Sequence, residues 1–383
     1  MFLCLFLFLF GINFMLYGDT LLLVPFGVSV IKKKRIRVNI TTFLLIAFVV
    51  AYLIPEFIIA QQPTYRLLFV PIAFLLGYNY YESVSEKDIV SCYLAVAFGM
   101  ATHSILNFVM TVAKTGFRFS NLSIFEDFWS RTTTTTTGMM SNFVLFLPLL
   151  IFAMVQRKKY YALVPVVALG VFMGVITGNR TTLFLFVVAT VVGMIIVFVN
   201  GQRKLGFALV AIIAGLLLFL LLAYLFNWFN LKSMYDNSYL VYRFNINRAN
   251  GESLLETQRW DTKGMYISKM LDYPWGGGKL REVIGGYAHD IWLDTWSWGG
   301  CVAFIILIGY LALFIYRMIR FIRMAEELST KVLFSGYLVI ILIQYLIEPI
   351  IQGAPWLFIS AALFDGMISR YLAQKTNEAV RRV

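Results

Sequence analysis

Long apolar runs, separated by short polar breaks, occupy most of this chain. Most runs are long enough for a helix rising 1.5 Å per residue to cross about 30 Å of hydrocarbon. The stretch 1–31 is also apolar and predicts either one kinked helix or two short ones broken at Gly18-Asp19. The pattern predicts an all-α polytopic membrane protein with eleven or twelve transmembrane helices. Besides 1–31, we place the spans near 39–60, 66–80, 89–112, 139–155, 161–177, 181–199, 205–226, 291–316, 332–350 and 356–372.

The polar breaks predict an orientation. Five of the six residues at 32–37 are Lys or Arg, and the breaks at 157–159, 203–204 and 317–331 are also basic. Basic loops stay in the cytoplasm, so these breaks are predicted to be cytoplasmic. Counting alternately places the other breaks outside, the longest of them being the segment 227–290. We therefore expect one large extracytoplasmic loop inserted between spans of a single membrane domain, 1–383.

Composition excludes a water-soluble fold, because 60% of the residues are hydrophobic, 14% are charged and the mean hydropathy is +0.79. The net charge of +12 reflects the cytoplasmic loops meeting anionic membrane lipids and does not indicate a nucleic-acid partner. Cys4, Cys92 and Cys301 all lie in predicted spans, which argues against a disulfide framework. We find no His, Cys, Asp and Glu cluster and predict neither a metal nor a cofactor.

The long outer segment predicts an amphipathic helix. The capping-box pattern Ser253-Leu-Leu-Glu256 opens a helix over about 254–272, which Tyr273-Pro274 ends. This helix carries an apolar stripe beside a polar stripe, which fits a helix lying on the outer membrane surface. A similar box, Ser123 to Glu126, predicts a short interfacial helix in the loop 113–138, and the threonines at 132–137 favour a structural role. The apolar stripe is Trp260, Gly264, Ile267 and Leu271, and the polar stripe is Glu256, Arg259, Lys263 and Tyr266.

Two histidines are present, and they differ in position. His103 lies mid-span, where a neutral imidazole hydrogen-bonded to a neighbouring helix is the favoured interpretation. His289 lies beside Asp290, where the outer segment re-enters the membrane. An imidazole with an ordinary pKa near 6.5 can take a proton from a hydroxyl at neutral pH. A helix-capping polar residue is the alternative interpretation of His289.

Arginines on the predicted outer face run against the charge bias. Arg180 stands in the short turn Gly178-Asn179-Arg180 between two spans. Planar guanidiniums facing one interface can hold a diphosphate by bidentate hydrogen bonds. The alternative is an arginine that reaches lipid head groups. Further outer arginines are Arg118, Arg131, Arg243, Arg248, Arg259 and Arg281.

Four motifs in order resemble the O-antigen ligase and polymerase superfamily. Its signature is a His followed by Asn, nine residues, Gly, two residues and Gly; this chain has His289-Asp290, then Gly300 and Ala303. Upstream, Arg259-Trp260 and the passage 272–278, which contains the turn Gly276-Gly277-Gly278, are similar to the family's arginine, tryptophan and glycine-turn passage. The turn 178–181 is similar to its Ser-Arg turn. Arg131 with Asn142 is placed like the arginine and asparagine that open an earlier span.

The resemblance implies an inverting, metal-independent glycosyltransferase that uses a glycan on polyprenyl diphosphate as donor. It implies that Arg180, Arg259 and, with less support, Arg131 bind the diphosphate, and that His289 acts as base. Gly276 and Gly278 would support the site, since a glycine backbone can approach a ligand closely. Asp290 stands where Asn is usual, and a carboxylate there would favour the imidazolium form of His289 unless it points away.

Three functions fit this pattern. A polysaccharide polymerase of the O-antigen or capsule type, acting on lipid-linked repeat units, is favoured because the chain has no extra acceptor-binding domain. A ligase would use the same apparatus on another acceptor, and a lipid-linked oligosaccharide flippase would need similar cationic sites. The expected location is the bacterial plasma membrane with the active face extracytoplasmic, and the expected partners are membrane lipids, a flippase and a chain-length regulator.

Overall fold

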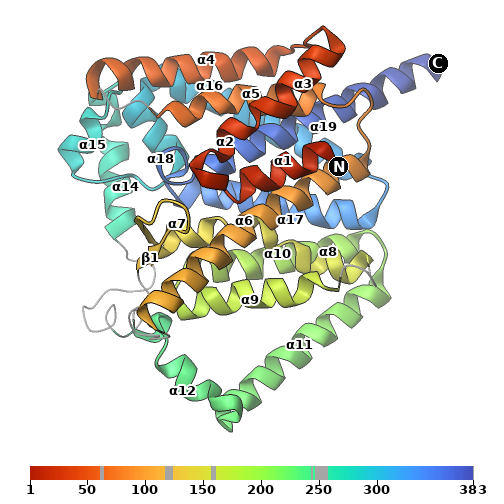
Figure 1. The fold of residues 1–383 in the computed structure, drawn as a ribbon, viewed down its shortest axis with the longest axis vertical. Coiled ribbons are helices and arrows are strands. Elements are labelled where there is room, and N and C mark those ends of the chain that lie inside the picture. The colour runs from red at the N-terminus through yellow and green to blue at the C-terminus, as the bar shows by residue number, and fades with distance from the viewer. Residues whose placement is uncertain (61–63, 117–123, 157–160, 243–244, 246–257, 383) are drawn as a thin grey trace. The chain divides into compact units, whose positions relative to one another are not determined.

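A computed structural model describes residues 1–60, 64–116, 124–156, 161–242, 245 and 258–382. The described chain is almost entirely helical and divides into two compact units (Figure 1). Unit 1 comprises 1–96, 256–323 and 341–383, and unit 2 comprises 97–255 and 324–340. Helices α6 (Glu86–Thr115), α16 (Ile291–Met324) and α17 (Leu328–Ile347) each contribute residues to both units.

The apolar helices confirm an all-α polytopic membrane protein. Seven of the described helical segments are long and apolar enough to cross a membrane. Three predicted spans correspond to shorter apolar helices at Phe2–Gly11, Tyr65–Asn79 and Leu163–Ile176, and the last predicted span lies within α19 (Pro355–Arg382). The seven segments are Ile40–Ile59, Glu86–Thr115, Thr136–Gln156, Arg180–Val199, Arg203–Leu225, Ile291–Met324 and Leu328–Ile347.

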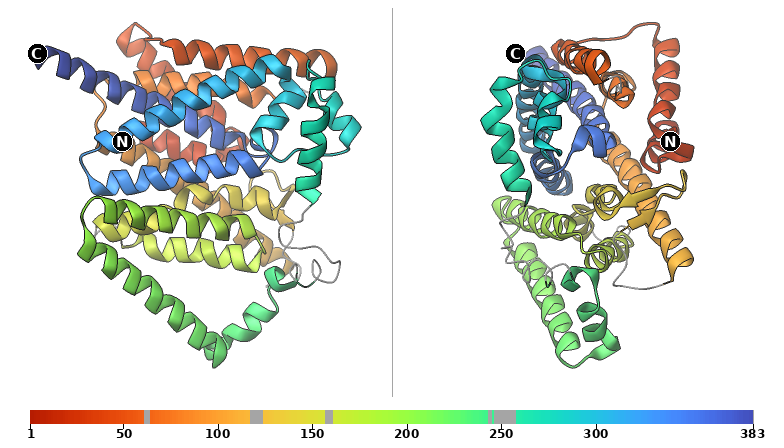
Figure 2. Two further views of the ribbon diagram at one scale, coloured as in Figure 1. Left: turned by 180° about the vertical axis from the view of Figure 1, so that it is seen from behind. Right: turned by 90° about the vertical axis from the view of Figure 1, so that its left-hand side faces the viewer.

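Unit 1 begins with the N-terminal apolar stretch, which forms short helices. The break between them lies at 12–17, just before the predicted Gly18-Asp19 position, where Asn13 and Met15 adopt left-handed backbone angles. The helices that lie wholly in unit 1, the N-terminal ones included, are drawn in Figure 2. They are α1 (Phe2–Gly11), α2 (Gly18–Leu21), α3 (Leu23–Lys33), α4 (Ile40–Pro55), α5 (Phe69–Asn79), α14 (Gln258–Lys269), α15 (Lys279–Ile284), α18 (Ile350–Gly353) and α19.

Glycines let α5 and α19 pack backbone to backbone. A methyl group on Gly77 would lie 2.1 Å from the carbonyl oxygen of Leu363, and one on Gly366 would lie 2.2 Å from that of Phe74. Small residues at helix contacts are the usual means of close packing in membranes, where apolar burial gives no preference for protein over lipid. These two helices therefore form the tightly packed centre of unit 1.

Unit 2 contains the remaining helices. Gly170 of α9 packs on the ring of Phe143, and α9 and α10 lie side by side in both Figure 1 and Figure 2. Helix α11 differs, because most of its side chains are exposed. The elements are α7 (Thr136–Ser141), α8 (Leu149–Gln156), α9 (Leu163–Ile176), α10 (Arg180–Val199), α11 (Arg203–Leu225) and α12 (Leu231–Asp236), with strands β1 (Ile124–Glu126) and β2 (Thr133–Thr135).

The predicted interfacial helix after Ser123 is wrong. Residues Ile124–Glu126 form β1, which pairs antiparallel with β2, so that Phe125 faces Thr134 across the hairpin. The β-branched threonines favour this extended pairing. Thr135 then caps α7 by accepting the backbone N–H of Gly138, which confirms the structural role predicted for the threonine run.

Candidate functional site

The amphipathic helix α14 turns its polar side to the protein. Lys263 donates to the carbonyl oxygen of Leu346, and Tyr266, fully buried, donates to that of Gly286 at 2.6 Å. The apolar stripe is uncovered, with Trp260 61%, Ile267 62% and Leu271 77% exposed. Helix α14 also runs across the direction of α4 and α16 (Figures 1 and 2). An apolar face left open in this way fits a membrane surface.

The described part of the predicted helix 254–272 agrees with this element. Helix α14 continues into a 3₁₀ turn at Met270–Asp272, and the chain leaves it at Tyr273, just before Pro274. The capping residues Ser253 and Glu256 lie outside the described residues. The backbone of Arg259 belongs to α14, and its side chain lies outside the described part of the chain.

The glycine turn and α16 interlock. Gly300 has φ 74° and ψ −173°, which breaks the helical path of α16 and frees two carbonyl groups. The N–H of Gly277 donates to the carbonyl oxygen of Trp298 at 2.7 Å, and that of Gly278 to the carbonyl oxygen of Ser297 at 2.8 Å. In the other direction, the N–H of Cys301 donates to the carbonyl oxygen of Pro274 at 2.8 Å. The break in α16 is thus satisfied by backbone from another segment.

Close packing explains why these positions are glycine. A methyl group on Gly276 would lie 2.4 Å from the carbonyl oxygen of Trp298, and one on Gly300 would lie 2.6 Å from that of Pro274. Gly276, Gly277, Gly278 and Gly300 all have positive φ, which side chains other than glycine rarely adopt. The close approach expected of Gly276 and Gly278 is therefore made to the protein's own helix.

His289 lies at the entrance to α16 in a left-handed conformation, with φ 59°. Such an angle is uncommon for a side-chain-bearing residue and persists only where the surroundings impose it. On one side, the buried Ala288 donates its N–H to Asp294 Oδ1 at 3.1 Å. On the other, Asp290 Oδ1 accepts the N–H of Leu293 at 2.7 Å. These bonds hold His289 in a fixed position.

Asp290 points to α14. Its carboxylate lies 3.2 Å from Nζ of Lys263, and both side chains are largely buried. Burial raises the pKa of Asp290, and the Leu293 N–H and Lys263 oppose that rise in part. Asp290 thus caps α16 with one carboxylate oxygen and pairs with Lys263 of α14 through the other.

Tyr287 links His289 to a cation, Arg281, that also faces a second aromatic ring. The guanidinium of Arg281 is 3.6 Å from the ring centroid of Tyr287 and 5.5 Å from that of Trp298. The rings of Tyr287 and His289 are 6.4 Å apart. Cations are attracted to aromatic faces, most strongly where water is excluded. A positive charge is therefore held against the Tyr287 ring, which is itself the aromatic neighbour of the candidate base.

A polar group from α4 and α18 reaches the same part of unit 1. Tyr52 is fully buried and accepts a hydrogen bond from the amide of Gln352. Glu56, Asp294 and Tyr287 lie near enough to the Tyr52 hydroxyl to interact with it electrostatically. We call His289, Asp294, Tyr52, Gln352, Arg281, Tyr287 and Trp298 the α16 entrance cluster.

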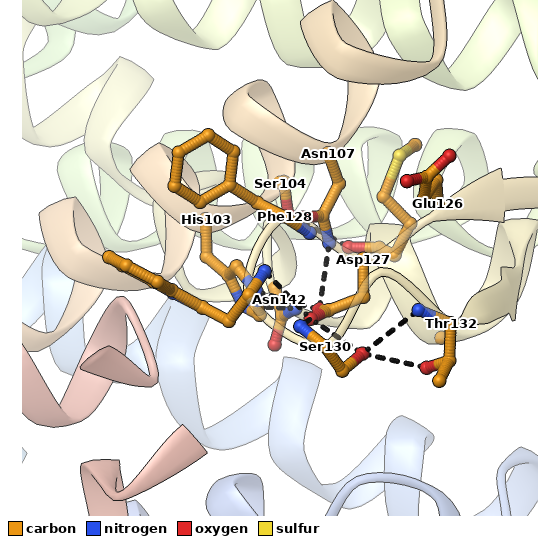
Figure 3. Close-up of polar contacts among 12 residues, drawn as sticks. His103, Ser104, Asn107, Glu126, Asp127, Phe128, Ser130, Thr132 and Asn142 are labelled. Atoms are coloured by element: carbon orange, nitrogen blue, oxygen red, sulfur yellow. Dashed lines mark hydrogen bonds and ion pairs between the residues drawn. The ribbon is translucent and has the colours of Figure 1, made fainter. Parts of the chain in front are cut away.

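In unit 2, His103 belongs to a buried hydrogen-bonded group (Figure 3). Its Nε2 lies 2.9 Å from Asp127 Oδ2, and its Nδ1 lies 3.3 Å from the amide nitrogen of Asn142. Since an amide nitrogen only donates, Nδ1 accepts and Nε2 carries the proton. The interpretation of His103 as an imidazole hydrogen-bonded to a neighbouring helix is confirmed.

Asp127 organises the β1–β2 hairpin that this histidine holds. Its Oδ1 accepts the backbone N–H and the hydroxyl of Ser130. Burial acts to raise the pKa of Asp127, but the hydrogen bonds from His103 and Ser130 outweigh it and keep this pKa well below its usual value. Arg131 lies in the loop between β1 and β2. Its backbone is left-handed, and its N–H donates to the carbonyl oxygen of Asp127.

Two arginines predicted to bind the diphosphate, Arg131 and Arg180, are described in unit 2. Arg180 is the first residue of α10 and is half-buried, and Asn179 caps the helix by accepting the N–H of Thr182 at 2.8 Å. The amide of Asn179 also contacts the carbonyl of Thr136 at 3.5 Å, just after β2. Arg131 is exposed, with its guanidinium 5.5 Å from the centroid of the Phe128 ring. Arg118, Arg243 and Arg248 lie outside the described residues.

The sequence did not single out several members of these groups. Asp294, Asp127 and Tyr52 were not predicted as site residues. Asp294 and Tyr52 lie inside apolar segments, and an ionisable residue inside a span is a recognisable signal of function. The partner of Asp127 is 24 residues away on another element, so no local pattern marks it. Among the described residues, no group of three or more His, Cys, Asp or Glu side chains is placed to hold a metal ion.

No family model matches this chain, and no curated protein matches it. The resemblance to the O-antigen ligase and polymerase superfamily therefore depends on the four motifs alone.

Proposed function

We propose that this chain is a bacterial plasma-membrane glycosyltransferase that polymerises lipid-linked repeat units of a surface polysaccharide. The observation that carries the proposal is the fixed position of His289, held left-handed between residues whose bonds to Asp294 and from Leu293 to Asp290 order the start of α16. The ring next to it, Tyr287, carries the guanidinium of Arg281. A base held rigidly at the end of a membrane-spanning helix suits chemistry on a lipid-borne substrate.

In this proposal, a hydroxyl of one repeat unit attacks the anomeric carbon of a glycan on polyprenyl diphosphate. His289 takes the hydroxyl proton, the new glycosidic bond forms, the bond from carbon to phosphate oxygen breaks, and the diphosphate leaves with inversion. Arg180 and Arg259, with Arg131 as a further contact, neutralise the leaving diphosphate by charged hydrogen bonds. No metal or cofactor takes part.

In the same proposal, the chain crosses the membrane eleven or twelve times and the segment 227–290 is extracytoplasmic. The uncovered apolar stripe of α14 supports it, because that stripe would rest in the outer lipid leaflet. A flippase would supply the substrate from the cytoplasmic face, and a chain-length regulator would act on the product.

The assay is purified protein incubated with lipid-linked repeat units alone, analysed for a ladder of polymer. We expect a ladder from the wild type and none from His289→Ala or Arg180→Ala, since removing a general base typically costs about 10²–10⁴-fold in rate. Arg320→Ala is the matched control, because Arg320 contacts only Thr376 among the bonds described and lies in a predicted cytoplasmic region.

Each other outcome points elsewhere. Product only after a separate acceptor is added indicates a ligase. Movement of the lipid across liposomes without new bonds indicates a flippase. Wild-type polymer from both His289→Ala and Arg180→Ala would refute the assignment of the site.

A further inference from the structure

Asp294 lies one turn into α16 and is 1% exposed. Its Oδ1 accepts the Ala288 N–H, whereas its Oδ2 is buried and has no hydrogen-bond partner among the described residues. A buried polar atom without a partner costs free energy, and the cost is greater for a group that can carry charge. A buried oxygen of this kind is expected to meet a ligand.

Two further buried polar atoms of unit 1 also lack a described partner. Their residues contact Tyr52 and Arg281, both of which interact electrostatically with Asp294. Gln352 uses its amide nitrogen on Tyr52, but its Oε1 is buried and without a described partner. The indole nitrogen of Trp298 is also buried and unpartnered among the described residues. Trp298 stands four residues after Asp294 on the same face of α16, and Arg281 lies close to both.

These atoms define the ligand's chemistry. Asp294 and Gln352 offer acceptors and Trp298 offers a donor, so the complementary ligand both donates and accepts hydrogen bonds. Sugar hydroxyls do both. A diphosphate offers acceptors only and cannot donate to Gln352 Oε1, so these residues suit the sugar and not the leaving group.

We propose that Asp294, Gln352 and Trp298 bind hydroxyls of the acceptor sugar and position it against His289. The inference rests on the proposed function and adds the acceptor site to it. Asp294 links the two parts directly, because one oxygen holds the Ala288 N–H beside His289 while the other receives the sugar. Tyr52 fixes the orientation of the Gln352 amide.

The alternative is that Asp294 only holds the turn at Ala288. Asp294→Asn separates the two roles, because an asparagine side chain keeps one carbonyl oxygen for the Ala288 N–H but loses the second acceptor. Gln352→Leu tests the same site without touching the turn. Thr190→Val is the matched control, since Thr190 also has a buried, unpartnered hydroxyl among the described residues but lies on α10 in unit 2.

Two probes are compared by equilibrium binding to purified protein: bare undecaprenyl diphosphate and the undecaprenyl-diphosphate-linked repeat unit. We expect the repeat unit to bind the wild type more tightly, and Asp294→Asn and Gln352→Leu to lose about tenfold or more of that sugar-dependent gain. Binding of bare undecaprenyl diphosphate stays unchanged in both variants and in Thr190→Val. The thermal unfolding temperature stays unchanged in Asp294→Asn and Thr190→Val, whereas Gln352→Leu lowers it because the variant loses the bond to the buried Tyr52 hydroxyl.

The binding readout is independent of turnover. If wild-type protein shows the sugar-dependent gain but forms no polymer, the proposed function fails and the sugar site is still judged by the variants. If Asp294→Asn and Gln352→Leu both keep the full gain, the acceptor site is refuted even where the wild type polymerises. A wild type without any sugar-dependent gain refutes it as well.

Discussion

At the scale of single residues, Lys263 and Asp290 form a buried ion pair between α14 and the start of α16. Removing one member of a buried pair leaves the other charge without compensation, typically at a cost of about 3–5 kcal/mol. We expect Lys263→Met to lower the free energy of unfolding by a large part of that range, measured by denaturation in detergent. Polymer formation should fall with it, because the pair connects α14 to the turn that carries His289.

The double variant provides the control. Asn also caps helices, so Lys263→Met with Asp290→Asn restores a neutral, capped α16 and should recover most of the lost stability. Burial already raises the pKa of Asp290, which means that its charged form is unfavourable in the folded protein and that Asn is tolerated. If the double variant is as unstable as Lys263→Met alone, the ion pair is not the cause.

The sequence could predict the position of His289 and the structural nature of His103, because both depend on where a residue falls within an apolar run. It could not predict which way Asp290 points, since that depends on Lys263, 27 positions earlier on another helix. It also left the left-handed conformation of His289 undetected, because the nearest glycine pair, Gly285-Gly286, comes three positions earlier and His289 itself carries a side chain.

At the scale of elements, the interlock of the glycine turn with α16 determines how His289 is presented. Gly300 occupies a region of φ and ψ that is open essentially to glycine alone, and any side chain there would also meet the Pro274 carbonyl. We expect Gly300→Ala to lower the free energy of unfolding by roughly 1–3 kcal/mol or more, and to abolish polymer formation.

Gly309 is the matched control because it lies in the same helix with no atom within 4 Å of an added methyl group. Gly309→Ala should be neutral or stabilise α16 by about 0.5–1 kcal/mol, the usual gain of alanine over glycine in a helix. Thermal unfolding of both variants in one detergent makes the comparison. Equal effects at Gly300 and Gly309 would contradict the interlock.

Elements with a strong period could be predicted, and those that depend on pairing could not. The apolar spans, and the end of the helical segment 258–272 just before Tyr273-Pro274, follow from run length and from proline chemistry. The first strand of the hairpin, Ile124–Glu126, was predicted to open a short helix, because a capping-box pattern is local whereas strand pairing joins residues further apart, such as Ile124 and Thr135. Gly276 was predicted to let the backbone approach a ligand, whereas the structure shows the close approach to α16.

At the scale of the whole molecule, the proposed reaction requires a defined orientation in the membrane. The basic breaks predict that 203–204 lies in the cytoplasm and 227–290 outside, and both regions contain exposed positions, Lys204 and Glu282. In a variant with Cys4, Cys92 and Cys301 replaced by alanine, a membrane-impermeant maleimide applied to intact cells should label Glu282→Cys and not Lys204→Cys. After the membrane is opened, both should react. Labelling of Lys204→Cys alone in intact cells would show that the topology is the inverse of the predicted one and that His289 lies on the cytoplasmic side. A polymerase acting outside the cell would then be excluded, whatever the activity of the His289 variants.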